Sequence, residues 1–120
     1  MNREPSSDAT ELRAKQLAMT RQTWQRLQHH GITTESELQL EFFYNAPTRA
    51  AALALEHALR EETDYDVGVV SNRDVWGIRG RTQPTKVDES VLLQWVDWMV
   101  SAGLQHHAVF DGWGAQVPRR

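Results

Sequence analysis

The chain has 120 residues, with 16 acidic and 13 basic side chains, a formal net charge of −3 and no cysteine. This length fits one domain, and folding should bury about two thirds of its unfolded surface. The charge argues against a protein that grips nucleic acid by long-range attraction, and the lack of cysteine excludes disulfides, thiol nucleophiles and thiolate metal sites. No segment has the roughly 18 apolar residues of a membrane span, and the polar N-terminus lacks the apolar run of a secretory signal, so we expect a cytoplasmic protein.

The first predicted element is an amphipathic helix. Asp8 or Ser7 can cap a helix that runs to about His30, where Gly31 provides the stop signal. Its leucine, methionine and tryptophan residues fall within one stripe, whereas lysine, arginine and glutamine lie opposite. We therefore expect this helix to dock on another element.

A strand, a helix and a hairpin follow. Apolar residues alternate from Leu38 to Tyr44, which predicts a half-buried strand. Pro47 suits the first turn of a second helix, which ends at the acidic turn near residue 64. Residues 65–70 and 75–81 are predicted strands, joined by a polar turn typical of a short hairpin.

The third predicted helix is apolar around much of its circumference. Asp88 caps it, it runs to about Ala102, and Gly103 is expected to close it. One apolar side of this helix can pack on the sheet, and its second apolar side must be covered either by the first helix or by a partner. A last strand is predicted to begin near Ala108.

This order predicts an α+β fold: a ferredoxin-like split βαβ sandwich (βαββαβ) with an extra N-terminal helix. Such a fold has an antiparallel sheet with two helices on one face and the other face open. Residues 1–7 are expected to form a disordered lead, and residues 8–120 a single domain.

The sequence contains no catalytic or metal-binding motif. The histidines at 29–30 and 106–107 lie at predicted helix ends, His57 stands alone, and no HxH or HExxH spacing accompanies them. Nucleophile and phosphate-cradling motifs are also missing. Gly77 and Gly80 lie inside a strand, where a bulge or a close backbone approach explains them. We therefore expect no enzyme, no metal and no cofactor.

A second group of residues suggests nucleic acid. Basic side chains cluster around Trp76, within fourteen residues that include the third predicted strand, namely Arg73, Arg79, Arg81 and Lys86. Alternation places Glu41 and Phe43 on the open sheet face together with Arg79 and Arg81, and turns Trp76 inward. An RNA-binding sheet of this kind displays aromatics for stacking, although this strand lacks the aromatic-rich RNP1 pattern. Glu41 is also expected to lie opposite Arg79, where the two would form an ordinary cross-strand pair.

Near the C-terminus stands the motif FDGWG, residues 110–114. Its two glycines permit a bulge or positive φ, so Trp113 can swing to a face that alternation would not give it. Asp111 can accept hydrogen bonds from the freed backbone NH groups. Either Trp113 seals the end of the core, or it anchors a partner.

Three segments in this order resemble the ribonuclease E inhibitor B family, the bacterial protein regulators of RNA degradation. They are TRQTWQRLQHHG (20–31), ELQLEFFYNAPTRAAALALEHAL (37–59) and FDGWG (110–114), and the likeness covers roughly residues 10–117. The resemblance implies a ferredoxin-like fold, no catalytic residue or cofactor, and a protein that binds ribonuclease E and restrains its cleavage of RNA. From the motif, Asp111, Gly112, Trp113 and Gly114 carry over as family markers.

The leading hypothesis is a non-catalytic regulatory protein that binds ribonuclease E or a related RNA-decay component. The expected contact residues are Glu41, Phe43, Arg79, Arg81, Asp111 and Trp113. The alternative is a single-stranded RNA-binding module that uses the same sheet face. A small-molecule enzyme formed by sheet-face dimerisation has only the fold in its favour, and the oligomeric state is left open.

Overall fold

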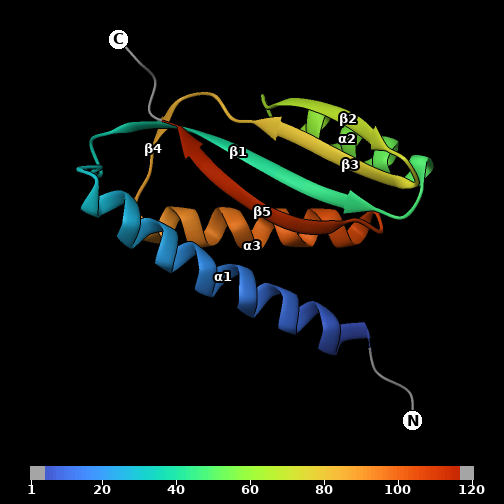
Figure 1. Cartoon of the computed structure of the whole chain (residues 1–120), viewed down its shortest axis with the longest axis horizontal. Coiled ribbons are helices and arrows are strands. Elements are labelled where there is room, and N and C mark those ends of the chain that lie inside the picture. The colour runs from blue at the N-terminus through green and yellow to red at the C-terminus, as the bar shows by residue number, and fades with distance from the viewer. Residues whose placement is uncertain (1–4, 117–120) are drawn as a thin grey trace.

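The computed structural model describes residues 5–116, and these form three helices and five strands (Figure 1). The elements in chain order are α1 (Pro5–His29), β1 (Glu37–Ala46), α2 (Arg49–Glu62), β2 (Asp66–Asn72), β3 (Val75–Arg81), β4 (Thr85–Lys86), α3 (Glu89–Gln105) and β5 (Val109–Gln116). Of the lead expected over residues 1–7, residues 1–4 lie outside the described part, and residues 5–7 already belong to α1.

The end of α1 and the start of α2 carry recognisable capping signals. Gly31 takes φ 87° after α1, and the Ile32 N–H donates to the carbonyl of Leu27 over 3.0 Å, as in a Schellman motif. At the start of α2, the Thr48 hydroxyl accepts the N–H of Ala51 over 3.1 Å. The predicted stop at Gly31 is confirmed.

The end of α3 differs from the prediction. Asp88 caps the helix as expected, but α3 continues through Gly103 to Gln105, and His107 takes the left-handed position with φ 62°. Gly103 is buried inside the helix, where an added Cβ would lie 2.6 Å from Cε2 of Tyr44. This glycine therefore permits close packing of α3 on the sheet and does not end the helix.

The strands form an open sheet in which every pairing is antiparallel. The order is β2-β3-β1-β5, and β4 pairs with the first residues of β1. Arg73, with φ 61°, turns the chain between β2 and β3. After β3, the Thr82 hydroxyl accepts the N–H of Leu40 over 3.1 Å, so a side chain bridges the gap between the β3 and β4 ladders.

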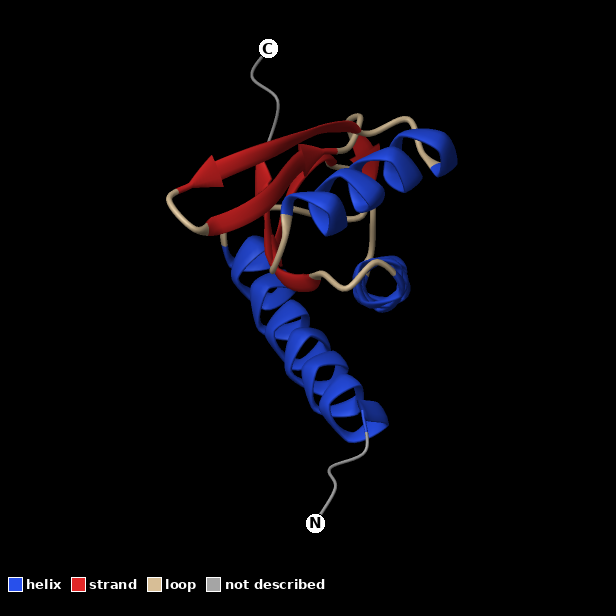
Figure 2. Cartoon of the chain, turned by 90° about the vertical axis from the view of Figure 1, so that its right-hand side faces the viewer, coloured by secondary structure: helices blue, strands red, loops and turns tan. Residues whose placement is uncertain are grey.

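One face of the sheet carries the core. The alternate residues of β1 on this side are buried, namely Leu38, Leu40, Phe42, Tyr44 and Ala46. Leu55 and Leu59 of α2 and Val96 and Met99 of α3 belong to one cluster with the central residues of this strand, so both helices cover the same face (Figure 2). The Tyr44 hydroxyl donates to the carbonyl of Met99 over 2.7 Å, and burial raises the pKa of this tyrosine.

Helix α1 covers the second side of α3, which was one of the two expected alternatives. An Arg13 guanidinium nitrogen donates to Ser101 Oγ over 2.7 Å, and Arg13 Nε lies 2.5 Å from Asp97 Oδ1. Further along α1, Gln16 Nε2 donates to the carbonyl of Phe110 over 3.3 Å. Side chains of α1 thus reach both α3 and β5, and Figure 1 shows α1 running obliquely along α3, with its N-terminal end lying away from the sheet.

Candidate functional site

The candidate site is the sheet face that carries no helix, called the open face below. Strand register sets its central row, in which Gly68, Arg79, Phe43 and Gly112 lie opposite one another on β2, β3, β1 and β5. This row places an aromatic ring and a guanidinium in the middle of the sheet and a glycine at either side.

Phe43 and Arg79 form a stacked pair. The guanidinium carbon of Arg79 lies 5.5 Å from the centroid of the Phe43 ring, which is the geometry of a cation–π contact. A Cβ added at Gly68, Gly112 or Gly114 would meet nothing within 4 Å. The pair therefore stands above flat, uncrowded flanks that a partner surface can approach.

A charged row runs beside the stacked pair. Asp66, Arg81 and Glu41 lie opposite one another on β2, β3 and β1, so the arginine has a carboxylate on each neighbouring strand. The expected pairing of Glu41 with Arg79 is wrong, because the register places Phe43 opposite Arg79. Within the described chain, none of these three side chains makes an ion pair or a hydrogen bond. Their charges remain available to water or to a partner.

The two rows together line a shallow hollow of about 440 Å³. Its side chains come from Glu41, Phe43, Asp66, Arg79 and Arg81, with backbone from Gly68. The sequence prediction named four of these residues, and the structure brings all four together. It missed Asp66 and Gly68, although the alternation of Asp66, Gly68 and Val70 with two buried or half-buried valines in β2 carried the signal.

The third row of the open face has an exposed valine at each end. Val70, Gly77, Asn45 and Val109 lie opposite one another, and the two valines are 43% and 46% exposed. A central aromatic–arginine pair beside exposed aliphatic side chains is the composition typical of protein interfaces.

Trp113 lies on the other side of the sheet. The pairing of β1 with β5 shifts between Phe43 and Tyr44, so Asp111 is one residue too many and Gly112 takes φ 147°. Because this bulge reverses the alternation, Trp113 lies opposite the buried Phe42 and faces the helices. The structure therefore does not bring Trp113 together with the four residues of the open face.

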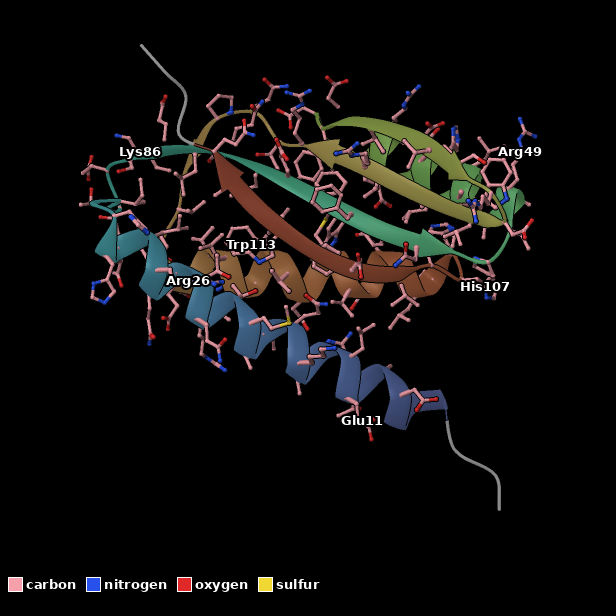
Figure 3. The ribbon with its side chains drawn as sticks, in the orientation of Figure 1. Glu11, Arg26, Arg49, Lys86, His107 and Trp113 are labelled. Carbon is pink, nitrogen blue, oxygen red and sulfur yellow. The ribbon has the colours of Figure 1, made fainter. Side chains whose placement is uncertain are left out.

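Trp113 makes defined contacts on the inner side. Its indole Nε1 donates to Thr20 Oγ1 over 3.0 Å, and its ring meets that of Trp95 edge to face at 6.0 Å. Figure 3 shows Trp113 on the side of β5 that faces the helices. The bulge that the glycines permit therefore places Trp113 where it connects β5 to both α1 and α3. Asp111, the extra residue, is exposed at the edge strand.

The basic cluster proposed from the sequence is dispersed. Arg73 lies in the turn between β2 and β3, and Lys86 on β4 pairs with Glu35 over 3.2 Å. Only Arg79 and Arg81 share the open face, where carboxylates are interleaved with them.

Two further features are absent from residues 5–116. No group of three or more histidine, aspartate or glutamate side chains there is arranged to hold a metal ion. None of the helices described combines the length and the apolar character that crossing a membrane requires.

The sequence matches the family described as Regulator of ribonuclease activity B over residues 17–115. No curated protein matches the chain. The matched residues include all of α2, α3 and the strands β1 to β4, and β5 except its last residue, so they cover the open face and the bulge before Trp113. The chain belongs to the Regulator of ribonuclease activity B family.

Proposed function

We propose that this protein is a non-catalytic regulator that binds ribonuclease E, or a related component of RNA decay, and thereby modulates RNA degradation in the bacterial cytoplasm. Its family supports a role in regulating ribonuclease activity. The observation that carries the choice of surface is the pair formed by the half-buried Phe43 and the exposed Arg79, which lies between glycines at the centre of the open face.

A ferredoxin-like βαββαβ arrangement is part of this proposal. The strand order β2-β3-β1-β5 and the placement of α2 and α3 on one face support it, with α1 and the short β4 as additions. In such an arrangement the open face is the broad surface left for a partner.

The chemistry of the open face favours recognition over catalysis. Glu41 and Phe43 are only half-buried, and Asp66, Arg79 and Arg81 are exposed, so water reaches every polar group of the hollow. Catalytic groups usually owe their perturbed pKa values to burial or to close charge partners. This face instead resembles an interface with an aromatic–arginine centre.

Surface plasmon resonance tests the proposal, with the catalytic and scaffold regions of ribonuclease E immobilised on separate channels. The wild-type protein should bind at least one region saturably. Phe43→Ala and Arg79→Ala should each weaken binding about tenfold, the effect of removing one interface hot spot. Met19→Ala, a change of an exposed side chain on α1, is the control. Unchanged affinity in both open-face variants would refute the choice of surface.

The alternative function, binding of single-stranded RNA, rests on the same pair, because an aromatic ring with a stacked arginine can hold a base. Glu41 and Asp66 on either side of Arg81 oppose a phosphate backbone. Titration of labelled single-stranded RNA at low salt separates the two functions. RNA binding predicts an affinity that falls steeply with salt and with loss of Arg81, whereas the regulator predicts no RNA binding.

A further inference from the structure

The helical side of the molecule carries a second hollow, at the end where α2 finishes and α3 begins. This hollow, called the Trp95 pocket below, has a volume of about 340 Å³. Its apolar walls are formed by Leu40, Tyr65, Pro84, Val87, Val91, Leu92 and Trp95. A volume of this size accommodates one large side chain of a partner or a small ligand.

The mouth of the Trp95 pocket continues onto an apolar stripe of α3. Val91, Trp95 and Trp98 follow one another at i, i+4 and i+7, so they share one side of the helix. Asp97 and Ser101, which contact α1, lie on another side. Val91 is 47% exposed and Trp98 is 39% exposed, so the stripe is apolar surface that α1 leaves uncovered.

The pocket also holds a free hydrogen-bond donor. The Tyr65 hydroxyl accepts the indole N–H of Trp95 over 2.9 Å, and no described residue accepts the hydroxyl proton. Burial raises the pKa of Tyr65, so the hydroxyl stays protonated at neutral pH. It can therefore donate to a carbonyl oxygen of an occupant.

Acidic side chains surround this end of the molecule. Asp64 lines the pocket, Glu62 ends α2, and Asp88 and Glu89 begin α3. The lysine of the neighbouring strand β4, Lys86, forms an ion pair with Glu35. The mouth is therefore negative, which favours an occupant with positive charge.

We propose that the Trp95 pocket and the stripe of Val91 and Trp98 form a docking site for a basic amphipathic helix of a partner protein. One large apolar side chain of that helix enters the pocket and packs against Tyr65 and Trp95. Its lysines or arginines lie over Asp64 and the end of α2. A helix fits better than a strand, because the stripe has helical spacing and the neighbouring strand β1 is already paired with β4.

This site is separate from the proposed ribonuclease contact. Leu40 lines the pocket from the buried face of β1, whereas Phe43 points to the open face of the same strand. The sheet therefore separates the two surfaces, and both can be occupied at once. Failure of one site in experiment leaves the other untouched.

Fluorescence anisotropy tests this docking site with a labelled peptide of about 18 residues, five turns of helix. The peptide is built from leucine and lysine, with leucine at i, i+3, i+4 and i+7. A second peptide carries glutamate in place of every lysine. We expect saturable binding of the lysine peptide alone, and its affinity should fall as salt is added.

Two matched variants locate the binding. Val91→Lys should weaken the lysine peptide about tenfold, because it places a like charge at the pocket mouth and removes an apolar contact. Val109→Lys adds the same charge at an equally exposed valine of the open face, 46% against 47%, and should leave the affinity unchanged. In NMR spectra, the indole N–H signals of Trp95 and Trp98 should shift on binding, and that of Trp76, at the opposite end of β3 from the pocket, should not.

Three results would each overturn the proposal. The first is the absence of saturable binding of the lysine peptide. The second is an equal loss of affinity in Val91→Lys and Val109→Lys, because the loss would then come from the added charge of the protein and not from the pocket. The third is a dimer in sedimentation that Val91→Lys dissociates, since a second copy of the chain would then be the natural occupant.

Discussion

Trp113 owes its role to a single extra residue in β5. Asp111 is inserted against the ladder of β1, so the tryptophan turns inward and bonds to Thr20. Its neighbours Gly112 and Gly114 leave the open face flat on the other side. At the scale of single residues, the FDGWG motif therefore shapes both faces, and only its glycines border the proposed interface.

The first prediction concerns the stability that Trp113 provides. Trp113→Ala should lower the free energy of unfolding by about 3 kcal/mol, because it removes a half-buried ring and leaves Thr20 without this donor. Urea denaturation followed by circular dichroism measures this. Asp111→Asn, an exposed change in the same motif, should stay within about 0.5 kcal/mol of wild type. Equal stabilities for Trp113→Ala and Asp111→Asn would contradict the inward placement.

The second prediction distinguishes two kinds of glycine. Gly103→Ala should destabilise the fold by about 1–3 kcal/mol despite the better helix propensity of alanine, because the new Cβ meets Tyr44 at 2.6 Å and the carbonyl of Ala108 at 3.0 Å. Gly114→Ala is the control, since its Cβ would meet nothing within 4 Å. Thermal denaturation of the two variants compares them. A Gly103→Ala protein as stable as wild type would show that α3 lies further from the sheet.

Among the elements, α1 and α3 end in the same way with different residues. Both close with a left-handed residue and a backbone bond across the last turn, but α1 uses Gly31 and α3 uses His107. A side chain with φ near 60° costs about 1–2 kcal/mol, which glycine avoids. At position 107, glycine should therefore be more favourable than the natural histidine.

The third prediction follows from these helix ends. His107→Gly should raise the free energy of unfolding by about 0.5–1 kcal/mol, the relief of backbone strain less the added chain entropy. Gly31→Ala, which places a side chain at φ 87°, should lower it by a similar amount. Both are measured by urea denaturation. A loss of stability in His107→Gly would mean that the imidazole makes a contact worth more than the strain.

The strands show how much of the fold the sequence predicts. Alternation in β1 and the polar turn before Val75 were enough to locate three strands, since half-buried strands repeat every two residues. The end of α3 was wrong, because Gly103 is a normal helix stop in sequence and its packing against Tyr44 is visible only in three dimensions. The short strand β4 was missed, since two residues carry no period.

Part of the candidate site was predictable from the sequence. Glu41, Phe43, Arg79 and Arg81 share a face because side chains alternate along each strand, and this alternation can be read from the sequence without any knowledge of contacts. The face of Trp113 was not predictable, since two glycines permit a bulge without fixing its position. The Trp95 pocket could not be predicted from the sequence either, because four separate segments of the chain come together to line it.

At the scale of the whole molecule, burial of two tyrosines on the helical side links stability to pH. Burial raises the pKa of Tyr44 and Tyr65 above the ordinary value of 10.0. The unfolded chain therefore loses these protons at a lower pH than the folded chain. Their contribution to stability is fully present below about pH 10 and is lost as the pH rises toward the folded-state pKa values.

The fourth prediction is alkaline unfolding with a tyrosine-dependent slope. Above about pH 10, the free energy of unfolding should fall by up to about 1.4 kcal/mol per pH unit through Tyr44 alone. Tyr44→Phe should be less stable at neutral pH, because the bond to the Met99 carbonyl is lost, yet its stability should fall less steeply with pH. Urea titrations at a series of pH values compare the slopes. Equal slopes would show that Tyr44 does not titrate with unfolding.

The central claim is that the open face lets this protein restrain a ribonuclease. The most direct measurement is the rate at which ribonuclease E cleaves an RNA substrate as increasing amounts of this protein are added, with Phe43→Ala and Met19→Ala in parallel. Wild type and Met19→Ala should slow cleavage alike, whereas Phe43→Ala should require about tenfold more protein for the same effect. A cleavage rate unchanged at every concentration of wild type, or a Phe43→Ala protein as effective as wild type, would contradict this claim.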